Sequence, residues 1–315
     1  MRFAILGAGA LGSIFSAKLA AAGHRVTLLG RSEAHVSAIR RHGLTVLAAP
    51  NQQMNYGSID ARVQSDGCEA ADVAIFLTKA QDSAAVAINA GPLIGENTAL
   101  VSLQNGIGSM ELIEEARPGC KMIQGATTVG AHVVEPGRIE ISPSTADSKA
   151  ISWIGPWQGT ADFSLTADIA ETLGLAGLPT EAYPDVAPLI WTKLAMNCAM
   201  NAVGAISRST VRQVSESQAG RSLIEEVIRE VISVANAQNI DLDTKAVIKA
   251  AWDVYAGTAN HIPSMAADLR AGRPTEVSAL NEAVVAKAQS LGISVPLNAT
   301  LVRLIRLSES GATRD

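Results

Sequence analysis

The sequence predicts an α/β fold in which an N-terminal doubly wound parallel sheet is followed by a C-terminal all-helical domain. Three observations predict it. Short buried strands alternate with helices in the first half of the chain, the first two strands enclose a glycine-rich turn, and apolar residues recur at the 3.6-residue helical period from about residue 185 onward. We therefore expect two domains, at residues 1–182 and 183–315, a length that accommodates two domains of ordinary size.

The N-terminal elements are predicted to form a βαβ unit. Residues 1–6 are typical of a short buried strand, a glycine loop follows, and a helix is expected from about residue 13 to residue 22, where Gly23 stops it. A second strand is expected at residues 25–29. Parallel strands joined by helices in this way indicate a Rossmann-type sheet.

The later elements continue both patterns. Apolar runs at residues 73–77 and 99–103 predict further strands, and short β-like pieces between about residues 123 and 156 predict an antiparallel extension that completes the first domain. The helical part contains four long periodic segments, at residues 187–207, 217–238, 244–271 and 275–291.

The composition indicates a globular protein with a small-molecule partner. Hydrophobic residues make up 48% of the chain and charged residues 17%, which argues against disorder. The net charge of -5 is spread without a basic block, so neither nucleic acid nor an anionic membrane surface is an expected partner. No segment reaches the roughly 20 uncharged apolar residues that span a bilayer.

Cysteine and histidine usage argues against disulfides and metals. The three cysteines, Cys68, Cys120 and Cys198, are too few and too scattered for a disulfide framework. None of the cysteines and none of the five histidines is paired at a metal-ligand spacing, so no protein-bound metal is expected. Reduced cysteines fit a cytoplasmic location.

The loop Gly7-Ala8-Gly9-Ala10-Leu11-Gly12 predicts a dinucleotide site. Glycines at this spacing let the backbone turn tightly, approach a pyrophosphate and pack the following helix on the strand. The helix N-terminus then offers free N–H groups to the phosphates. The spacing alone is weak evidence, but here it follows a strand and opens a helix within a βαβ unit, so a mere tight turn is the poorer interpretation.

Arg31 favours NADP(H) over NAD(H). An NAD-binding protein commonly places an acidic residue after the second strand to bind the ribose 2′-hydroxyl, but this chain has Gly30-Arg31-Ser32 there. A guanidinium pairs with a 2′-phosphate, which a carboxylate would repel. The alternative is a solvated surface arginine.

Two polar residues follow predicted strands at the sheet edge where ligands bind. Lys79 lies just past the strand at residues 73–77, and Asn105 just past the strand at residues 99–103. A solvated lysine and ordinary turn chemistry before Gly106 explain these residues equally well.

Lys193, Asn197 and Asn201 form the most informative pattern. Their i, i+4, i+8 spacing puts them in one polar row on a helix whose other faces are apolar. Buried ammonium and amide groups need partners, so this row either faces a polar ligand or is satisfied by hydrogen bonds in the core.

With these residues in place, the sequence resembles the ketopantoate reductase (2-dehydropantoate 2-reductase) family along essentially its whole length. The matching features are the glycine loop with Arg31, Thr78-Lys79, Gln104-Asn105-Gly106, Thr127-Thr128 with Ala131, the Trp191–Asn197 helix, Ser264-Met265, and Thr275-Glu276 followed by Asn281.

The resemblance implies NADPH-dependent reduction of a 2-keto acid to a 2-hydroxy acid, in a cleft between a Rossmann domain and a helical domain. It assigns Lys193 as general acid, a role that suits an ammonium next to a carbonyl oxygen that gains negative charge. Burial is expected to lower the pKa of this lysine. The implied roles of the other residues are cofactor contact for Ala131, bridging of cofactor and substrate carbonyl for Asn105, substrate hydrogen bonds for Asn197 and Asn201, and carboxylate binding for Ser264.

Glu276 has two interpretations. The resemblance implies that it contacts cofactor or substrate hydroxyl, or helps to place the lysine. Without it, a carboxylate after Pro274 is expected in the first turn of a helix, where it complements the helix dipole.

The chain departs from the family pattern at His261, Val211 and Glu282, where the family often has Asn, Asn and Gly. We expect His261 either to contact substrate or to be structural. The most favoured activity is reduction of ketopantoate to pantoate in pantothenate biosynthesis. The alternatives are a relative that reduces another branched 2-keto acid and a non-catalytic NADP(H) sensor. The Ala-rich helical domain leaves room for a homodimer face.

Overall fold

The computed structural model describes residues 1–49, 52–57, 59–146 and 151–311, in two compact units. Unit 1 comprises Met1–Gln104 and Ser109–Val186. Unit 2 comprises Ala187 onward together with the short segment Asn105–Gly108. The predicted α/β class, with a parallel sheet first and helices after it, is confirmed.

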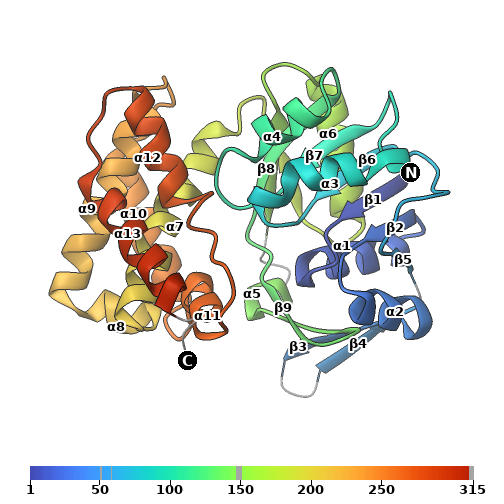
Figure 1. Ribbon diagram of the computed structural model, residues 1–315, viewed down its shortest axis with the longest axis horizontal. Helices are drawn as coiled ribbons and strands as arrows, with labels where there is room; N and C mark the ends of the chain where they lie inside the picture. The colour runs from blue at the N-terminus through green and yellow to red at the C-terminus, as the bar shows by residue number, and fades with distance from the viewer. Residues whose placement is uncertain (50–51, 58, 147–150, 312–315) are drawn as a thin grey trace. The chain divides into compact units, whose positions relative to one another are not determined.

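An eight-stranded sheet forms the centre of unit 1 (Figure 1). Its strand order is β12-β11-β8-β7-β6-β1-β2-β5, and all pairs from β8 to β5 are parallel. The predicted first strands are confirmed, and β1 lies between β2 and β6, where the order along the chain reverses. The strands are β1 (Arg2–Leu6), β2 (Arg25–Leu29), β5 (Asp60–Arg62), β6 (Val73–Phe76), β7 (Ala99–Ser102), β8 (Lys121–Thr127), β11 (Ser152–Pro156) and β12 (Thr180–Ala182).

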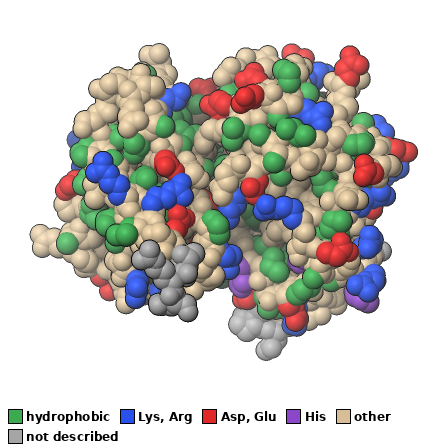
Figure 2. Space-filling model, in the orientation of Figure 1, with side chains coloured by type: hydrophobic (Ala, Val, Ile, Leu, Met, Phe, Trp, Pro, Cys, Tyr) green, Lys and Arg blue, Asp and Glu red, His purple; other side chains and the backbone are tan. Residues whose placement is uncertain are grey.

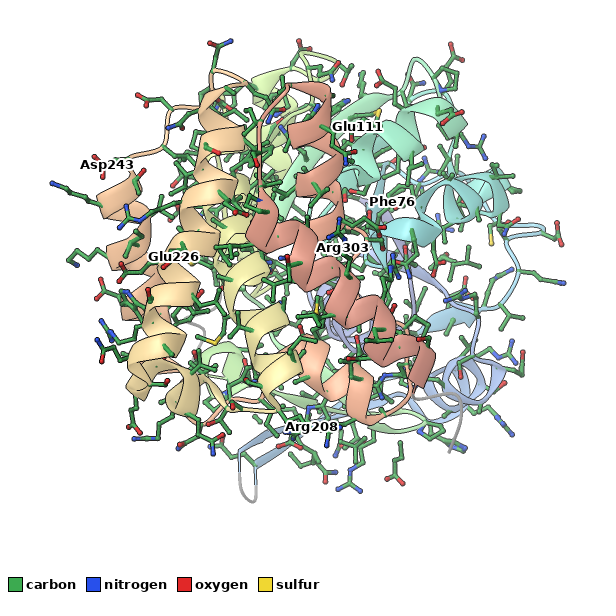
Figure 3. All side chains as sticks on the ribbon, turned by 60° about the vertical axis from the view of Figure 1, so that its left-hand side comes forward. Phe76, Glu111, Arg208, Glu226, Asp243 and Arg303 are labelled. Atoms are coloured by element: carbon green, nitrogen blue, oxygen red, sulfur yellow. The ribbon has the colours of Figure 1, made fainter. Side chains whose placement is uncertain are left out.

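Both faces of this sheet are buried, which is why its strands are continuously apolar. In β1, Phe3 and Ile5 pack in one cluster with residues of three helices, while Ala4 and Leu6 pack in a second cluster with residues of two others. Burying each such large side chain contributes about 1.5–3 kcal/mol. The first cluster includes α1 (Ala10–Ala21), α2 (Glu33–His42) and α6 (Phe163–Leu175); the second includes α3 (Ser83–Asn89) and α4 (Ser109–Ala116). Phe76, which ends β6 inside this second cluster, is labelled in Figure 3.

A separate four-stranded sheet corrects part of the predicted extension. As expected, β11 runs antiparallel to β8 in the large sheet. However, β9 (Ala131–Glu135) and β10 (Arg138–Ile141) belong to a second sheet, ordered β4-β3-β10-β9, with β3 (Leu44–Ala49) and β4 (Gln52–Tyr56). Because β10 pairs in parallel with β3, which lies far away in the chain, no local sequence pattern predicts this sheet. The remaining short helices of unit 1 are η1 (Ala80–Asp82), η2 (Gly91–Leu93) and α5 (Pro143–Ala146).

Unit 2 is built around the long helix α7 (Ala187–Ser207), which was predicted at these residues. It packs against α8, α9, α11 and α13 (Figure 1), and most of its residues are buried because Ala and Gly allow close helix contacts. The other helices are α8 (Val211–Glu216), α9 (Gln218–Asn236), α10 (Thr244–Gly257), α11 (Ser264–Arg270), α12 (Asn281–Ser290) and α13 (Pro296–Gly311). None of the described helices is both long and apolar enough to span a bilayer.

Two predicted helices are shorter than expected. The segment 244–271 is divided into α10 and α11, because Pro263 cannot continue the helical hydrogen bonds and restricts the residue before it. The segment 275–291 becomes helical only at Asn281. Glu276 therefore lies in a hydrogen-bonded turn, and its predicted place in the first turn of a helix is wrong.

Charged side chains of both signs are interspersed on the face of the molecule seen in Figure 2, in keeping with the small net charge of the sequence.

Candidate active site

A cavity of about 710 Å³ in unit 1 lies at the carboxyl ends of β1, β2 and β6. This is the topological switch point of the sheet, where ligands bind in open α/β folds, and the volume is in the range of a cofactor site. The lining residues are Gly7, Ala8, Gly9, Leu29, Gly30, Arg31, Ser32, Val63, Leu77, Thr78, Lys79, Asp82, Ala85, Val86 and Asn89.

The three glycines of the loop have different steric duties. Gly7 adopts a φ of 122°, and a Cβ there would come within 2.9 Å of the Leu77 backbone; one on Gly12 would lie 1.8 Å from the carbonyl oxygen of Gly7. A Cβ on Gly9, by contrast, would meet open space. Gly9 also precedes α1 and offers no side chain to cap it, so the first N–H groups of the helix stay available to an anion. The residues thus fit a bound pyrophosphate.

Buried hydrogen bonds hold this loop from behind. The Gly137 N–H donates to Nδ1 of His35 at 3.1 Å, so the His35 proton is on Nε2, which lies 2.9 Å from the Ser13 hydroxyl. Ser13 in turn donates to the carbonyl oxygen of Gly9 at 2.8 Å. Burial lowers the pKa of His35, which keeps the imidazole neutral and the chain of donors intact.

Arg31 and Lys79 both line the cavity, as predicted for cofactor-binding residues. The Arg31 side chain is 85% exposed and pairs with Asp82 at 2.9 Å. Lys79 is half-buried. Two cationic side chains therefore line the cavity, Arg31 just after β2 and Lys79 just after β6. The end of β2 is where the ribose of a dinucleotide is expected.

Of the described residues, several that were predicted to bind the cofactor do not line this cavity. Ala10, Leu11 and Gly12 form the first turn of α1, where their backbone N–H groups face the loop side of the helix terminus. Ala131 is the first residue of β9 and packs against the core of unit 1.

Two polar residues near this site have no role predicted from the sequence, although Gln104 is part of the matching Gln104-Asn105-Gly106 segment. Asp82 lines the cavity from η1. Gln104, buried after β7, donates to Thr78 Oγ1 and the Thr78 carbonyl at 3.2 and 3.0 Å and thereby ties the loop after β6 to the loop after β7. Their position just beyond buried strands was the available signal.

Unit 2 contains a second polar cluster, centred on Lys193. Its Nζ donates to Oδ1 of Asn105 at 2.7 Å, and Nδ2 of Asn105 donates to Oε2 of Glu276 at 3.1 Å. The three residues come from α7, the segment Asn105–Gly108 and the turn before α12, so the structure brings together all three predicted catalytic residues. Gly106 makes the approach possible: its φ is 87°, and a Cβ there would lie 2.0 Å from the Ala279 carbonyl oxygen.

The environment of Lys193 tunes its charge. Burial among the apolar residues of α7 lowers the pKa of the ammonium from 10.5 to about 8, and the Glu276 carboxylate opposes this by favouring the charged form. A lysine with a pKa near 8 is charged at neutral pH and donates its proton more readily than an exposed one.

Asn197 and Asn201 extend the row from Lys193 along α7, as the spacing predicts. Each is partly exposed, whereas Cys198, Ala199 and Ala202 beside them are buried. Within the described part of the chain, neither amide side chain makes a hydrogen bond to another residue. Their amides are therefore available to a ligand.

The loop before α11 lies against the far end of this row. Pro263 approaches Gly204 so closely that a Cβ on Gly204 would lie 2.7 Å from its ring, so only glycine fits there. Ser264 begins α11, and both Ser264 and His261 are exposed. Partial desolvation of the ring lowers the pKa of His261, which favours the neutral imidazole.

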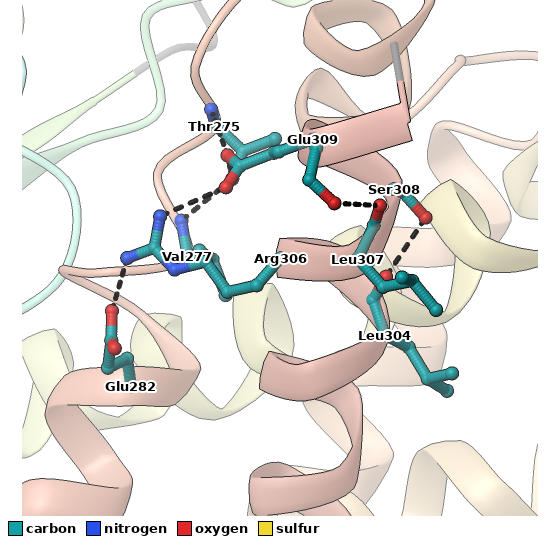
Figure 4. A network of polar contacts seen from close by, with 9 residues as sticks. Thr275, Val277, Glu282, Leu304, Arg306, Leu307, Ser308 and Glu309 are labelled. Carbon is teal, nitrogen blue, oxygen red and sulfur yellow. Dashed lines mark hydrogen bonds and ion pairs between the residues drawn. The ribbon is translucent and has the colours of Figure 1, made fainter. Parts of the chain in front are cut away.

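A network from α13 fixes the turn that carries Glu276 (Figure 4). Glu309 accepts from both the N–H and the hydroxyl of Thr275 at 2.8 Å, and the hydroxyl oxygen accepts from the Val277 N–H at 3.2 Å. Arg306 pairs with Glu309 at 3.0 Å and also with Glu282. Both neighbours of Glu276 are thus anchored, which explains why these residues do not join α12.

The departures from the family pattern have local structural roles. Val211 is buried at the start of α8, and its N–H donates to the His261 carbonyl oxygen at 3.1 Å. Glu282 pairs with Arg306, as described above. Asn281, a matching residue, donates to the carbonyl oxygen of Cys198 at 2.9 Å and so supports α7 from its buried side.

Two family profiles together match most of the chain. The family profile "Ketopantoate reductase PanE/ApbA" matches residues 3–159, and its partner "Ketopantoate reductase PanE/ApbA C terminal" matches residues 185–309. The chain belongs to the ketopantoate reductase family. It is similar to the 2-dehydropantoate 2-reductases of Pyrococcus horikoshii, with 32% identity over 98% of both chains, and of Halobacterium salinarum, with 30% identity over 98% of this chain and 99% of that one.

Solved structures share the fold of this chain. A PanE/ApbA family ketopantoate reductase from Ralstonia eutropha superposes with a TM-score of 0.88, at 27% identity and complete coverage of both chains. A D-mandelate dehydrogenase solved with NADH and anilino(oxo)acetate superposes with a TM-score of 0.91, at 25% identity over 99% of this chain and all of that one.

Family membership confirms the predicted chemistry at the level of the class. This ketopantoate reductase family member is an oxidoreductase acting on CH–OH groups, and it uses the NADP(H) on which the family depends. The roles of individual residues stay predictions.

Proposed function

We propose that this protein reduces 2-dehydropantoate (ketopantoate) to pantoate with NADPH, and that Lys193 is the general acid. The observation that carries this proposal is the hydrogen-bonded group Lys193–Asn105–Glu276, in which a desolvated ammonium is oriented by an amide and faces a carboxylate. The two alternative functions, reduction of another 2-keto acid and non-catalytic sensing of NADP(H), are outcomes of the test described below.

The cofactor, when bound, supplies a hydride to C2 of the keto acid. As the C2–H bond forms, the carbonyl electron pair moves to oxygen, which gains negative charge. The Lys193 ammonium stabilises this charge and transfers its proton to the oxygen, giving the 2-hydroxy acid and neutral lysine. Solvent then returns a proton to Lys193.

Asn105 and Glu276 prepare the lysine for this step. Asn105 accepts one of the three ammonium protons, which fixes the direction of the remaining two. Glu276 both accepts from Asn105 and raises the lysine pKa, so that the acid stays protonated at neutral pH.

We assign the substrate contacts to the row that continues from Lys193. The free amides of Asn197 and Asn201 are suited to the keto acid's hydroxyl and carbonyl groups, and Ser264 is suited to its carboxylate. His261, next to Ser264 and exposed, is assigned to the same end of the substrate.

The cofactor contacts are assigned to unit 1. The pyrophosphate is placed on the N-terminus of α1, where Gly7-Ala8-Gly9-Ala10-Leu11-Gly12 provides backbone N–H groups. Arg31 and Lys79 are placed on the 2′-phosphate side, and Ala131 and Glu276 keep the cofactor roles implied by the sequence resemblance.

The same proposal includes a cytoplasmic enzyme that forms homodimers through its helical unit. Unbridged Cys68, Cys120 and Cys198 are in keeping with a reducing compartment. Cell fractionation and light scattering of the purified protein test these two statements independently of activity.

The decisive experiment follows NADPH absorbance with a panel of 2-keto acids. Ketopantoate is compared with 2-oxoisovalerate, which lacks its hydroxymethyl group, and with phenylglyoxylate, the keto acid related to mandelate. A preference for ketopantoate in kcat/KM supports the proposal. A preference for another acid assigns a different substrate, and tight NADPH binding without turnover indicates a sensor.

A further inference from the structure

We infer that Asp82 sets the choice between NADPH and NADH, by competing with the 2′-phosphate for the guanidinium of Arg31. The inference rests on the proposed role of Arg31 and deepens it. It concerns a residue that neither the glycine loop nor the sequence pattern after β2 brings to attention.

The geometry places the competitor inside the cofactor cavity. Both Arg31 and Asp82 line it, one from the end of β2 and the other from η1 after β6. Their charged atoms are 2.9 Å apart, while the Asp82 side chain is 28% exposed and that of Arg31 is 85% exposed. Asp82 is therefore the more firmly held partner, and Arg31 is the one free to reorient.

The Asp82 carboxylate is not used for helix capping. Asp82 occupies the N-cap position of α3, where aspartate commonly accepts a hydrogen bond from the helix backbone, yet its side chain makes no such bond. Its backbone N–H is held by the Lys79 carbonyl oxygen at 2.9 Å. The carboxylate is thus directed to Arg31 by the backbone of the turn, and neutralising it removes no cap.

This pairing affects the two cofactors differently. NADPH must take the Arg31 guanidinium from Asp82, so part of the binding free energy of its 2′-phosphate is lost in breaking the ion pair. NADH carries a hydroxyl at the same place and leaves the ion pair undisturbed. Asp82 therefore lowers the affinity for NADPH relative to the affinity for NADH, so that the enzyme can use both cofactors.

The test compares kcat/KM for NADPH and NADH at low ionic strength in the wild type and in Asp82→Asn. Exposed ion pairs are worth about 0.2–1 kcal/mol, so we expect the NADPH/NADH ratio to rise about 1.4- to 5-fold, and less in 0.5 M salt. Glu111→Gln, at a residue of α4 labelled in Figure 3, is the matched control because it changes the net charge equally. Glu111 is not among the residues that line the cavity, so this variant should leave the ratio unchanged.

A second background separates this inference from the proposal on which it rests. If Asp82 acts through Arg31, Asp82→Asn has no effect on the ratio when combined with Arg31→Ala. A ratio that still rises in the double variant, or that stays unchanged in Asp82→Asn alone, overturns the competition. If Arg31→Ala lowers the NADPH and NADH values equally, the proposed 2′-phosphate contact itself is wrong.

Discussion

The Nζ atom of Lys193 lies 2.7 Å from Oδ1 of Asn105, although 88 positions separate the two residues in the chain. This bond fixes a side chain that would otherwise have four freely rotating bonds. It also means that the acid of the proposed reaction is preorganised before substrate binds, which is where enzymes gain most of their electrostatic advantage.

Replacing Lys193 with alanine should abolish turnover while cofactor binding persists. General acids contribute about 10²- to 10⁴-fold to the rate, and the cofactor cavity is lined entirely by unit 1 residues. Steady-state kcat and NADPH fluorescence titration measure the two effects. Lys249→Ala, at an exposed lysine of α10, is the control; near-normal turnover in Lys193→Ala would refute the assignment.

The reduction rate should fall as pH rises above about 8. The ammonium must be protonated to act as acid, and its pKa in the protein is about 8, so kcat/KM declines through that value on the alkaline side. Glu276→Gln keeps a hydrogen-bond acceptor for Asn105 but removes the charge that raises the lysine pKa. Its alkaline limb should therefore move to lower pH; an unmoved limb would show that another group controls it.

Glu309 should act on the same pH profile without touching the reacting atoms. Glu309→Ala frees Thr275 and so loosens the turn that carries Glu276. We expect the alkaline limb to shift in the direction seen for Glu276→Gln, with partial rescue in Glu309→Gln, which keeps one acceptor. Glu282→Ala is the control because Glu282 also pairs with Arg306 but does not contact Thr275. Equal shifts in both alanine variants would argue for a general loss of order.

Gly9→Ala and Gly12→Ala should impair different properties, NADPH binding in the first and folding stability in the second. A methyl group on Gly9 meets no atom within 4 Å, so the variant should have a normal melting temperature. It should bind NADPH weakly, because Gly9 lines the cavity and the methyl group would occupy space expected for the pyrophosphate. A methyl group on Gly12 collides with the Gly7 backbone, so that variant should lose about 1–3 kcal/mol of stability or more. Thermal unfolding and NADPH titration together distinguish them; equal melting temperatures would contradict the structure.

His35 should make stability fall in mild acid. Its folded-state pKa lies below the unfolded value of 6.5, so the unfolded chain binds more protons as the pH falls through and below 6.5. The contribution of His35 is complete above that pH and is lost progressively below it. Urea midpoints at pH 7.5 and pH 5 should differ more in the wild type than in His35→Gln, which cannot be protonated. Equal differences in the two proteins would show that His35 does not cause the loss of stability in acid.

Much of unit 1 could be predicted because its signals are local. The strands around the glycine loop are short, apolar and bounded by turns, and both faces of β1 are buried, so Phe3 to Leu6 needed no distant partner to be recognised. The sheet formed by β3, β4, β9 and β10 was missed because its central pairing joins Thr45 to Arg138, and neither segment shows that dependence alone.

The site was predictable to a similar extent. Helical spacing puts Lys193, Asn197 and Asn201 in one row, and the structure confirms the row. The sequence pattern could not predict the conformation around Glu276, because the turn there depends on Glu309, which lies in α13. The Asp82–Arg31 pair likewise joins two loops whose proximity follows only from the sheet order.

The grouping of Asn105–Gly108 with the helical unit has a consequence for protein engineering. A fragment that starts at Ala187 contains Lys193 and Glu276 but lacks the amide that links them. Exchange of helical domains between relatives, as a means to alter substrate choice, must therefore carry these four residues along. The proposed catalytic group is thus discontinuous in the sequence, and both of its segments have to be transferred in such an exchange.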